Sequence, residues 1–427
     1  MESENAWLPK PLSISLKFTT ISLCQKTDGY GGAKRENLPN FCCFLADFFL
    51  FLAFGFIDLR FHMALMDVQT KIDLVRKGSV LEVLTEDELK NLFETNSHPS
   101  HYIGFEISGK VHLGTGLCTA LKIRDFVEAG IKPTIFLADY HAFLNKKLGG
   151  DLERIQTVAK GYFKSAMYAS LLCAGLDEEQ AGRVRFVMGS DLYAEKGLDY
   201  WTSALNVSQN TTKERMLRCT TIMGRMSTET ALPTSALLYP AMQVADIWAL
   251  GADIAHAGMD QRKVHVLARE MADKMKKPKP VAVHCSLLGS LTGPGRMDPN
   301  ATEDDKMIAG KMSKSNPDSC IFIHDSPDEI ARKLKKAYCP EKVVEDNPIV
   351  QMAETFVLRD RPLKVERPEK FGGNVEFVDA AELKEAFVGG KLHPMDLKNA
   401  VGRELIAMLE PARKYFEKHP KLLEQAL

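Results

Sequence analysis

Two lysines that lie close together are the residues best suited to bind a polyanion. The segment 311–315 reads KMSKS, and it lies between Gly310 and the turn residues Asn316 and Pro317. Its two ammonium groups can donate charge-assisted hydrogen bonds to phosphate oxygens, and phosphoryl chemistry depends mainly on positioning and charge neutralisation. The flanking glycine and proline predict a loop that moves as a unit. The alternative is a solvated lysine loop without a ligand.

A second segment could meet the same phosphates from the start of a helix. Residues 112–115 read HLGT, and they lie between a strand-like run and an amphipathic stretch. Gly109 and Gly114 allow the backbone to approach a phosphate closely, and a helix N-terminus favours negative charge. Taken alone, His112 is equally consistent with a core histidine at a strand–helix turn. Together, the two segments predict a nucleoside triphosphate site and attack on an α-phosphate.

Three polar residues share one face of an otherwise apolar helix. Tyr239, Gln243 and Asp246 are spaced i, i+4 and i+7, which places them on one side of a helix. A buried amide or carboxylate without a partner is costly, so a small ligand with an ammonium or hydroxyl group would satisfy them. Gln261 could reach the same pocket from the start of the next helix. The alternative is a solvent-exposed polar stripe.

The elements that must position these groups alternate along the chain. Short apolar runs and longer amphipathic stretches predict parallel βαβ units and an α/β doubly wound, Rossmann-like sheet, on which ligands bind beyond the carboxyl ends of the strands. The expected strands are residues 102–106, 134–138, 184–188, 254–256 and 281–285. The expected helices are residues 113–129, 151–174, 235–250 and 261–276, and helices dominate the C-terminal part.

The pattern also divides the chain into regions. Residues 190–234 are polar, helical and basic in places, so we expect an insertion that serves as an interaction surface. A helix with Ser326 as its N-cap and an acidic first turn follows the lysine loop, which indicates a domain boundary near residue 325. We therefore expect a catalytic domain at 63–325 and a mainly α-helical domain at 326–427.

The first 62 residues differ from the rest. Residues 41–57 form a phenylalanine-rich run that is too short for a membrane span and follows too long a polar stretch for a signal peptide. We interpret residues 1–62 as a gene-model artefact, with Met63 or Met66 as the true start. The alternative is an appendage that lies on a partner or on a membrane surface.

The composition is typical of a soluble globular protein of the cytoplasm. Hydrophobic residues make up 45% of the 427 positions, and the formal net charge is −1, so overall charge would not hold a nucleic acid. Such a partner would need a local basic surface. The nine cysteines form no CxxC pair and no cluster at zinc spacing, which predicts reduced thiols and no metal site.

These motifs together resemble the class I aminoacyl-tRNA synthetases, and within them the tyrosyl-tRNA synthetases of the archaeal and eukaryotic type. Residues 112–115 are similar to the family's HIGH motif and residues 311–315 to its KMSKS motif. The HIGH motif usually ends in histidine, and Thr115 stands there instead, which puts the role of this position in doubt. Further similar segments are 102–106 (YIGFE), 137–142 (LADYHA), 239–246 (YPAMQVAD), 258–263 (GMDQRK), 367–373 (RPEKFGG) and 393–400 (HPMDLKNA). The resemblance runs from about residue 70 to the C-terminus.

The resemblance implies a two-step reaction. The carboxylate of L-tyrosine attacks the α-phosphate of ATP to give tyrosyl-adenylate and pyrophosphate, and a terminal ribose hydroxyl of tRNA(Tyr) then takes the tyrosyl group. Mg²⁺ accompanies ATP and neutralises pyrophosphate. The implied catalytic residues are His112, Lys311 and Lys314.

The resemblance also implies binding residues. Tyr102 and Asp246 would hold the phenolic hydroxyl of tyrosine. Its α-ammonium side would be held by Tyr239, Gln243 and Gln261, with Glu106 assisting. The residues expected to bind ATP are Gly109, His112, Gly114, Thr115, Lys311, Ser313 and Lys314. The domain at 326–427 would bind the anticodon, and the residues expected there are Phe371, His393, Pro394, Met395 and Asp396.

Alternatives stay open for several of these assignments. Phe371 could be a core phenylalanine, and Asp396 could simply be an acid in the first turn of a helix. The insertion at 190–234 would, by resemblance, form a homodimer interface and contact the acceptor stem. For the whole chain, the alternatives are a tryptophanyl-tRNA synthetase, a nucleotidyltransferase that makes a small adenylate, and a catalytically silent RNA-binding paralogue.

Overall fold

The structure is a computed structural model that describes residues 66–224, 232–294, 302–313 and 316–426. The predicted extension 1–62 and two residues of the lysine loop, Lys314 and Ser315, lie outside the described residues. Leu65–Leu427 form one compact unit. Within the described part, no helix is both long enough and apolar enough to cross a membrane.

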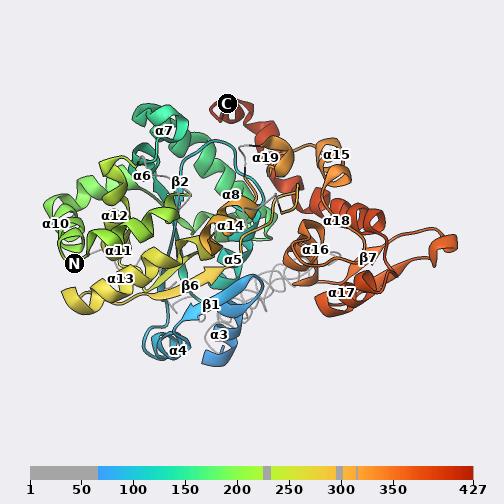
Figure 1. Cartoon of the computed structure of the whole chain (residues 1–427), viewed down its shortest axis with the longest axis horizontal. Helices are drawn as coiled ribbons and strands as arrows, with labels where there is room; N and C mark the ends of the chain where they lie inside the picture. Colours follow the sequence, from blue (N-terminus) through green and yellow to red (C-terminus); the bar gives the residue numbers. More distant parts are fainter. Residues whose placement is uncertain (1–65, 225–231, 295–301, 314–315, 427) are drawn as a thin grey trace, which may run out of the picture. The chain divides into compact units, whose positions relative to one another are not determined.

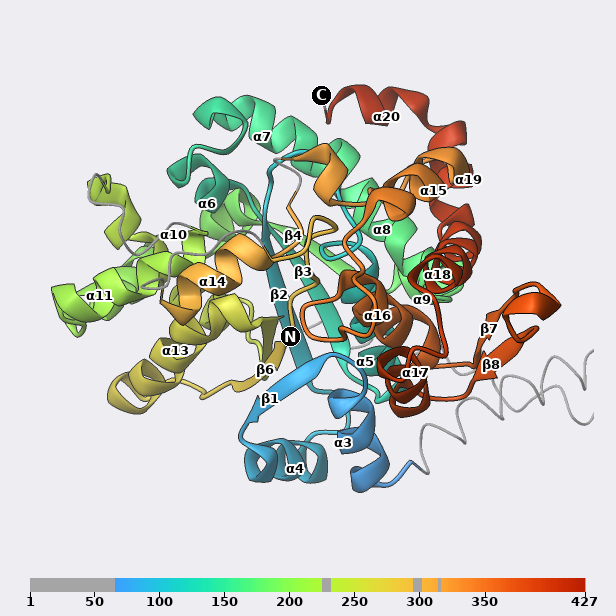
Figure 2. The ribbon, with the colours of Figure 1, turned by 45° about the vertical axis from the view of Figure 1, so that its right-hand side comes forward.

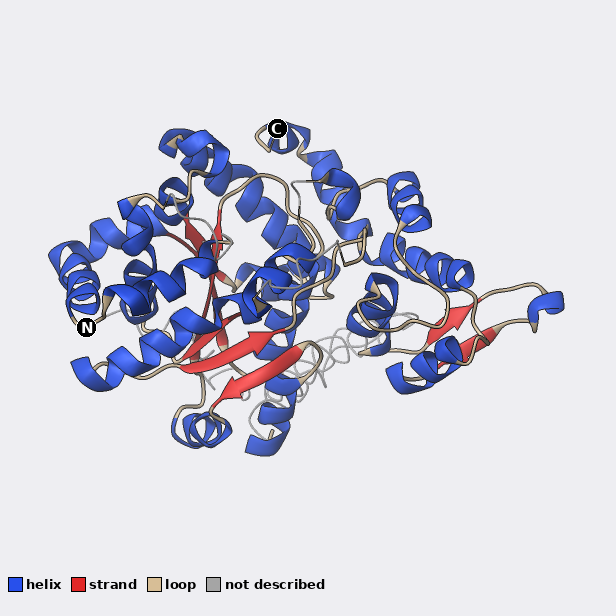
Figure 3. Cartoon of the chain, viewed as in Figure 1, coloured by secondary structure: helices blue, strands red, loops and turns tan. Residues whose placement is uncertain are grey.

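A six-stranded sheet carries the candidate site (Figures 1 and 3). The strand order is β1-β6-β5-β2-β3-β4, with β1 antiparallel to β6 and all other neighbours parallel. The five parallel strands confirm the predicted doubly wound sheet, and the order reverses between β5 and β2. The strands are β1 (Val80–Leu84), β2 (Ser100–Glu106), β3 (Lys132–Ala138), β4 (Arg185–Met188), β5 (Ile254–Gly258) and β6 (Val281–Cys285).

Helices cover both faces of the sheet because its parallel strands are apolar on both sides. Ile103 and Ile135 belong to a core shared with α5 and α8, whereas Tyr102 and Phe136 belong to a core shared with α10, α12 and α13. Successive side chains of a strand point to opposite faces, so Tyr102 and Glu106 both face α12. These helices are α5 (Leu117–Glu128), α8 (Lys164–Cys173), α10 (Gly189–Gln209), α12 (Tyr239–Ala249) and α13 (Arg262–Met275).

Three elements differ from the sequence prediction. The edge strand β1 was not predicted, because its residues are only partly covered and carry Glu82 at the centre. Helix α5 begins at Leu117 rather than at residue 113, because residues 113–116 form the turn that holds the HLGT segment. The single helix predicted at 151–174 is interrupted by a π-helical turn, Ala159–Phe163, between α7 (Leu152–Val158) and α8.

The C-terminal region is mainly helical, as predicted. Ser326 accepts the backbone N–H of Glu329 and caps the first of its helices. Because Leu65–Leu427 form a single compact unit, the boundary near residue 325 stays a prediction. The elements are α15 (Pro327–Lys336), α16 (Pro348–Met352), β7 (Leu363–Val365), β8 (Val375–Phe377), α17 (Ala380–Val388), α18 (Pro394–Met408), α19 (Glu410–Lys418) and α20 (Pro420–Glu424).

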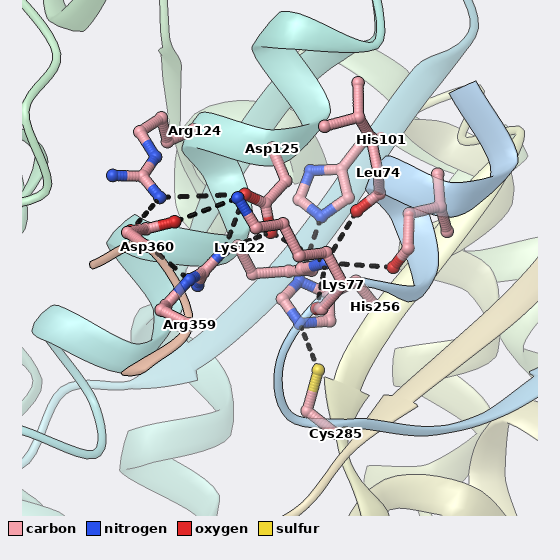
Figure 4. A network of polar contacts seen from close by, with 11 residues as sticks. Leu74, Lys77, His101, Lys122, Arg124, Asp125, His256, Cys285, Arg359 and Asp360 are labelled. Atoms are coloured by element: carbon pink, nitrogen blue, oxygen red, sulfur yellow. Dashed lines mark hydrogen bonds and ion pairs between the residues drawn. The ribbon is translucent and has the colours of Figure 1, made fainter. Parts of the chain in front are cut away.

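A buried ionic network joins this region to helix α5 (Figure 4). The guanidinium of Arg359 lies 2.7 and 2.8 Å from the two carboxylate oxygens of Asp125. The ammonium of Lys122 lies 2.9 Å from the same carboxylate and also donates to the carbonyls of Leu74, Val75 and Lys77. Those carbonyls lie at the C-terminal end of helix α3 (Val68–Arg76). Lys122 therefore caps α3 and also neutralises the carboxylate of Asp125 on α5. Figure 2 shows a second junction, where α19 lies beside α8.

Candidate active site

A cavity of about 460 Å³ opens beyond the carboxyl ends of β2, β5 and β6. This is where doubly wound sheets bind their ligands. Its lining includes His112 and Lys311 from the two phosphate-type segments, and Gln243 and Asp246 from the polar face of α12. The three groups singled out in the sequence therefore meet in one cavity. Since Tyr239, Gln243 and Asp246 are all buried, the alternative of an exposed polar stripe is wrong.

Asp246 is fully buried and only half satisfied. Its Oδ1 accepts a hydrogen bond of 2.9 Å from the hydroxyl of Tyr200. Its Oδ2 faces Nε2 of His141 at 3.5 Å, and neither of these two atoms has a hydrogen-bond partner among the described residues. Burial raises the pKa of Asp246 well above its usual value. Because Oδ1 is already bonded to Tyr200, Oδ2 is the oxygen that can bond to a hydroxyl group entering the cavity.

Tyr102 lies beside this aspartate because a glycine follows two residues later on the same face of β2. A Cβ atom on Gly104 would lie 2.6 Å from the Tyr102 hydroxyl, so the phenol can fold back over the strand only with glycine at that position. Burial, and then the charge of Asp246, raise the pKa of Tyr102 well above its usual value. Tyr102 therefore stays protonated and can donate its own hydrogen bond.

Glu106 collects three donors at the end of β2. Its Oε1 accepts from Nδ2 of Asn145 at 2.7 Å and from the hydroxyl of Tyr239 at 2.9 Å. The ammonium of Lys147 lies 3.2 Å from its Oε2. The two glutamines lie nearby in the same lining, where Gln243 donates to Gln261 at 3.3 Å. These contacts fix acceptors and donors that suit a zwitterionic amino acid.

His112 is oriented by its own segment. The backbone N–H of Gly114 donates to its Nδ1 at 3.1 Å, and the hydroxyl of Thr115 lies 3.3 Å from its Nε2. A Cβ on Gly114 would lie 3.1 Å from the imidazole, so this glycine provides the room for the ring. Thr115 thus contacts His112 directly, which gives the unusual fourth position of the motif a local role. Gly109 is not among the cavity-lining residues. Its φ of +96° is a backbone conformation that favours glycine, so the turn before His112 explains this residue.

The first lysine of the KMSKS segment is held by an acid. The ammonium of Lys311 lies 2.9 Å from Oδ2 of Asp260, and both residues line the cavity. The backbone N–H of Met312 donates to the carbonyl of Leu288 at 2.7 Å, which seats the segment beyond β6 although helix α14 (Glu303–Gly310) intervenes. Ser313 also lines the cavity, whereas Lys314 lies outside the described residues.

Backbone hydrogen bonds join the flanks of the two segments. The N–H of Leu113 donates to the carbonyl of Ile321 at 2.9 Å, and the N–H of Ile323 donates to the carbonyl of Val111 at 3.1 Å. The residues on either side of His112 are therefore fixed to the chain that follows the lysine loop. This pairing brings two segments that are distant in sequence to one wall of the cavity.

The family of this fold follows from comparison with known proteins. Residues 94–410 match the family model for class I tRNA synthetases of the tryptophan and tyrosine group. The chain is 51% identical to the tyrosine–tRNA ligase of Thermococcus sibiricus over 372 residues, which cover 84% of this chain and 98% of that protein. The chain belongs to the class I tRNA synthetases, among the archaeal-type tyrosyl-tRNA synthetases.

Solved structures agree with this assignment. The tyrosyl-tRNA synthetase of Pyrococcus horikoshii in complex with L-tyrosine superposes with a TM-score of 0.79 at 49% identity, over 84% of this chain and 99% of that one. The tryptophanyl-tRNA synthetase of Aeropyrum pernix reaches 19% identity and a TM-score of 0.58 over 81% of this chain and 85% of that one, so it shares the fold alone. The tyrosyl alternative is thus favoured over the tryptophanyl one.

Sequence reasoning missed four residues of this synthetase's cavity region. His141 and Lys147 line the cavity. Asn145 donates a hydrogen bond to Glu106, and Tyr200 donates one to Asp246. His141 stood in a segment similar to the family, but no spacing rule connected it with Asp246. Tyr200 lies on α10, in the segment interpreted as an interaction surface. Its contact with Asp246 is purely tertiary, and no local signal could have indicated it.

The predicted anticodon residues of the synthetase lie around the β7–β8 hairpin and the start of α18. The side chain of Phe371 is 60% exposed, so the alternative of a core phenylalanine is wrong. Arg367 donates to the carbonyls of Gly373 and Lys391, both at 2.6 Å, and so ties the Phe371 turn to the chain before α18. The remaining residues differ in access, since His393 is an exposed N-cap, Met395 and Asp396 are partly covered, and Pro394 is buried.

Proposed function

We propose that this protein is the ligase that activates L-tyrosine with ATP and transfers it to tRNA(Tyr). One observation carries the proposal: the fully buried Asp246 keeps one acceptor oxygen without a partner among the described residues, in a cavity that also contains His112 and Lys311. A deep acceptor suits the phenol of tyrosine, and a cationic mouth suits a triphosphate. The high identity to tyrosine–tRNA ligases supports the same conclusion.

Tyrosine is read by its hydroxyl group and by its ammonium group. The phenol donates to Oδ2 of Asp246 and accepts from Tyr102, whose hydroxyl stays protonated. Tyr239, Gln243 and Gln261 hold the ammonium side, with Glu106 setting the direction of Tyr239. Phenylalanine would leave both polar groups unpaired, and tyrosyl-tRNA synthetases are themselves the established example of discrimination of this kind.

ATP is held at the mouth of the cavity. His112 and Lys311 donate to the phosphates, and Lys314, Ser313 and Thr115 belong to the same segments. Lys311 leaves Asp260 as the phosphates arrive, and exchanging one anion for another keeps its charge neutralised. Gly114 lets the backbone of the histidine segment approach the phosphates, and Gly109 allows the turn that leads into this segment.

The reaction needs no covalent intermediate with the enzyme. A carboxylate oxygen of tyrosine forms a bond to the α-phosphorus while the bond from that phosphorus to the bridging oxygen breaks, and pyrophosphate leaves. A terminal ribose hydroxyl of tRNA then attacks the carbonyl carbon of the adenylate, and AMP leaves. The residues named above act by orienting the two substrates and by stabilising the charge on the phosphates.

Mg²⁺ would enter with ATP rather than bind to a protein cage. Among the described residues, no three His, Cys, Asp or Glu side chains converge to hold a metal ion. An ion that enters with ATP would be bound mainly by substrate phosphates, with at most one or two carboxylates such as Asp260. When bound, it would neutralise the departing pyrophosphate.

The partners follow from two exposed surfaces. Phe371 offers an aromatic ring for stacking on an anticodon base, with the ammonium of Lys370 above it at 4.9 Å. Arg367 ties the Phe371 turn to the chain before α18, at whose start His393, Met395 and Asp396 are accessible and Pro394 is buried, and there Asp396 can accept from a base edge. The region 326–427 is therefore the anticodon-binding domain of this proposal, and 63–325 is the catalytic domain.

Helix α10, in the insertion, is the surface for a second copy of the chain. Leu198, Trp201 and Leu205 are 83%, 40% and 60% exposed and recur at the spacing of one helical face. We place the homodimer interface there and the enzyme in the cytoplasm, where its free cysteines stay reduced. Leu205→Lys should shift the molar mass in light scattering from that of a dimer to that of a monomer, whereas Leu81→Lys on the edge strand β1 should not.

Pyrophosphate exchange tests the activation step. Exchange of pyrophosphate into ATP should require tyrosine and should not occur with tryptophan or phenylalanine. Asp246→Ala should weaken exchange and reduce selectivity for tyrosine. Asp253→Asn is the matched control, because Asp253 accepts from Ser100 at the opposite end of the sheet. A folded protein that exchanges with none of the three amino acids would remove the proposed function.

The tRNA step has its own test. Phe371→Ala should raise the KM for tRNA(Tyr) in aminoacylation and leave tRNA-independent exchange unchanged. An unchanged KM would remove the anticodon assignment without affecting the assignment of the tyrosine pocket.

A further inference from the structure

A buried tyrosine outside the cavity connects three parts of the synthetase. Tyr162 lies in the π-helical turn between α7 and α8, and its hydroxyl accepts the backbone N–H of Val111 at 2.9 Å. Val111 directly precedes His112, and its carbonyl accepts the N–H of Ile323 at 3.1 Å. Both polar groups of the Val111 backbone are therefore satisfied, one by Tyr162 and one by the chain that follows the KMSKS segment. The ring of Tyr162 packs against His324 and Phe416, with centroids 6.0 and 5.6 Å away.

The C-terminal tail holds this tyrosine in place. Oε1 of Gln425 accepts the backbone N–H of Tyr162 at 2.9 Å. A Cβ on Gly161 would lie only 2.0 Å from that oxygen, so a larger residue at 161 would push the Gln425 amide away from this hydrogen bond. The carbonyl of Ala426 lies 3.7 Å from where a Cβ on Gly109 would stand, on the loop before His112. The tail is thus bonded to the π-helical turn and lies close to the loop before His112.

We propose that Tyr162, held by Gln425, is a positioning residue for the phosphate side of the ATP site. The inference rests on the proposed function. A buried backbone N–H must find a partner, and the tyrosine hydroxyl supplies it one residue before the imidazole that meets the phosphates. Single π-helical turns occur frequently at functional sites, and here the turn points the hydroxyl at Val111. The last residues of the chain thereby act on ATP binding without touching ATP.

Tyr162→Phe tests the hydroxyl without removing the ring. It should raise the KM for ATP in tRNA-independent exchange about tenfold, the factor expected when one buried N–H loses its partner. The KM for tyrosine should stay within about twofold, because the tyrosine pocket does not contact Val111. Tyr168→Phe is the matched control, since Tyr168 lies further along α8 beside Tyr415 and away from the cavity. A role in stability alone would lower the urea midpoint and leave the KM for ATP unchanged, and that result would overturn the proposal.

The tail supplies tests that do not disturb the core. Gln425→Leu removes the acceptor and should raise the KM for ATP about threefold, whereas Gln425→Glu keeps an acceptor oxygen and should restore wild-type values. Gly161→Ala should also raise the KM for ATP, although alanine favours the helix more than glycine does. Adding Gln425→Leu to Tyr162→Phe should add little, since both act on one path. Full additivity, or equal KM values for the leucine and glutamate variants, would overturn the role of the tail.

The proposal can fail separately from the proposed function. Loss of tyrosine-dependent exchange in the wild-type protein would remove the function itself. Normal wild-type exchange that Lys311→Ala abolishes, together with an unchanged KM for ATP in Tyr162→Phe, would remove only the positioning role.

Discussion

Two fully buried aspartates of this synthetase have opposite surroundings. Asp125, on α5, receives Arg359 on both oxygens and Lys122 in addition. Asp246, on α12, accepts a hydrogen bond of 2.9 Å from Tyr200, and its second oxygen has no hydrogen-bond partner within the described structure, with His141 3.5 Å away. Both side chains are equally inaccessible to water. The difference teaches that burial does not separate a structural carboxylate from a ligand-binding one, whereas the supply of donors does.

The largest effect should come from breaking the satisfied site. Arg359→Ala removes the guanidinium that bonds to both oxygens of the buried Asp125 and leaves Lys122 at 2.9 Å and the more distant Arg124 at 4.0 Å, so the free energy of unfolding should fall by about 3–5 kcal/mol. Urea unfolding measures this loss. Arg361→Ala is the control two residues away, because its pair with Glu404 is partly exposed to solvent and should be worth less than about 1 kcal/mol. Equal losses for the two variants would contradict the comparison.

The unsatisfied site should behave in the opposite way. Asp246→Asn replaces a carboxyl group whose charged form burial disfavours with a neutral amide of similar size, so the free energy of unfolding should stay equal or rise by about 1 kcal/mol. The same change should lower kcat/KM for tyrosine by about ten- to a hundredfold, because the acceptor for the phenol is weakened. Exchange kinetics and urea unfolding on one preparation measure both quantities. A variant that loses stability and activity together would make Asp246 a structural residue like Asp125.

The hydroxyl of Tyr200, which donates to Asp246, provides a finer test. Tyr200→Phe removes the hydrogen bond of 2.9 Å to Oδ1 of Asp246, and the KM for tyrosine should rise about tenfold while the KM for ATP stays constant. Tyr140→Phe, on the neighbouring helix α6 (Asp139–Leu144), serves as the control. Equal KM values for tyrosine in Tyr200→Phe and wild type would show that α10 does not support the pocket.

The smallest effect should come from a buried basic group, His101, and from the pH dependence that it gives to stability. Burial lowers the pKa of His101 to about 3, and its ring contacts His256 at 3.2 Å and packs on Phe126. The unfolded chain binds a proton near pH 6.5, and the folded chain does not until about pH 3. The free energy of unfolding therefore falls as the pH drops below 6.5. The slope is up to about 1.4 kcal/mol per pH unit well below pH 6.5, and it is smaller near pH 6, where the unfolded chain is only partly protonated.

His101→Gln should remove this contribution to the slope of unfolding free energy against pH. Asp246 contributes to this slope with the opposite sign. At a pH above the usual pKa of aspartate, the unfolded chain has lost the proton, whereas the raised pKa keeps it on Asp246 in the folded state. Its cost therefore grows as the pH rises. Urea titrations from pH 5 to pH 8 on the two variants should separate these slopes, and identical slopes would show that neither group titrates as described.

The sequence predicted what depends on local pattern. The five parallel strands were found close to their true bounds because each is a short apolar run between turns, and the shared face of Tyr239, Gln243 and Asp246 followed from helical spacing. The partners of Asp246 could not be predicted, since Tyr200 reaches it from 46 residues away across two packed helices. The π-helical turn was missed for a similar reason, because an extra residue in one helical turn leaves no mark in composition. Contacts between residues that are distant in the sequence become visible only in the three-dimensional structure.

The network around Asp125 also determines when the chain can complete this ionic contact during its synthesis. Arg359 lies 234 residues after Asp125, and a ribosome adds about 5–20 residues per second. Helix α5 therefore waits roughly ten to fifty seconds, at that rate, before its carboxylate can meet the arginine. During synthesis, the half of the protein that holds tyrosine and ATP remains without one of its internal counter-ions. We expect that the nascent chain becomes fully stable only when residues from its last third have left the exit tunnel.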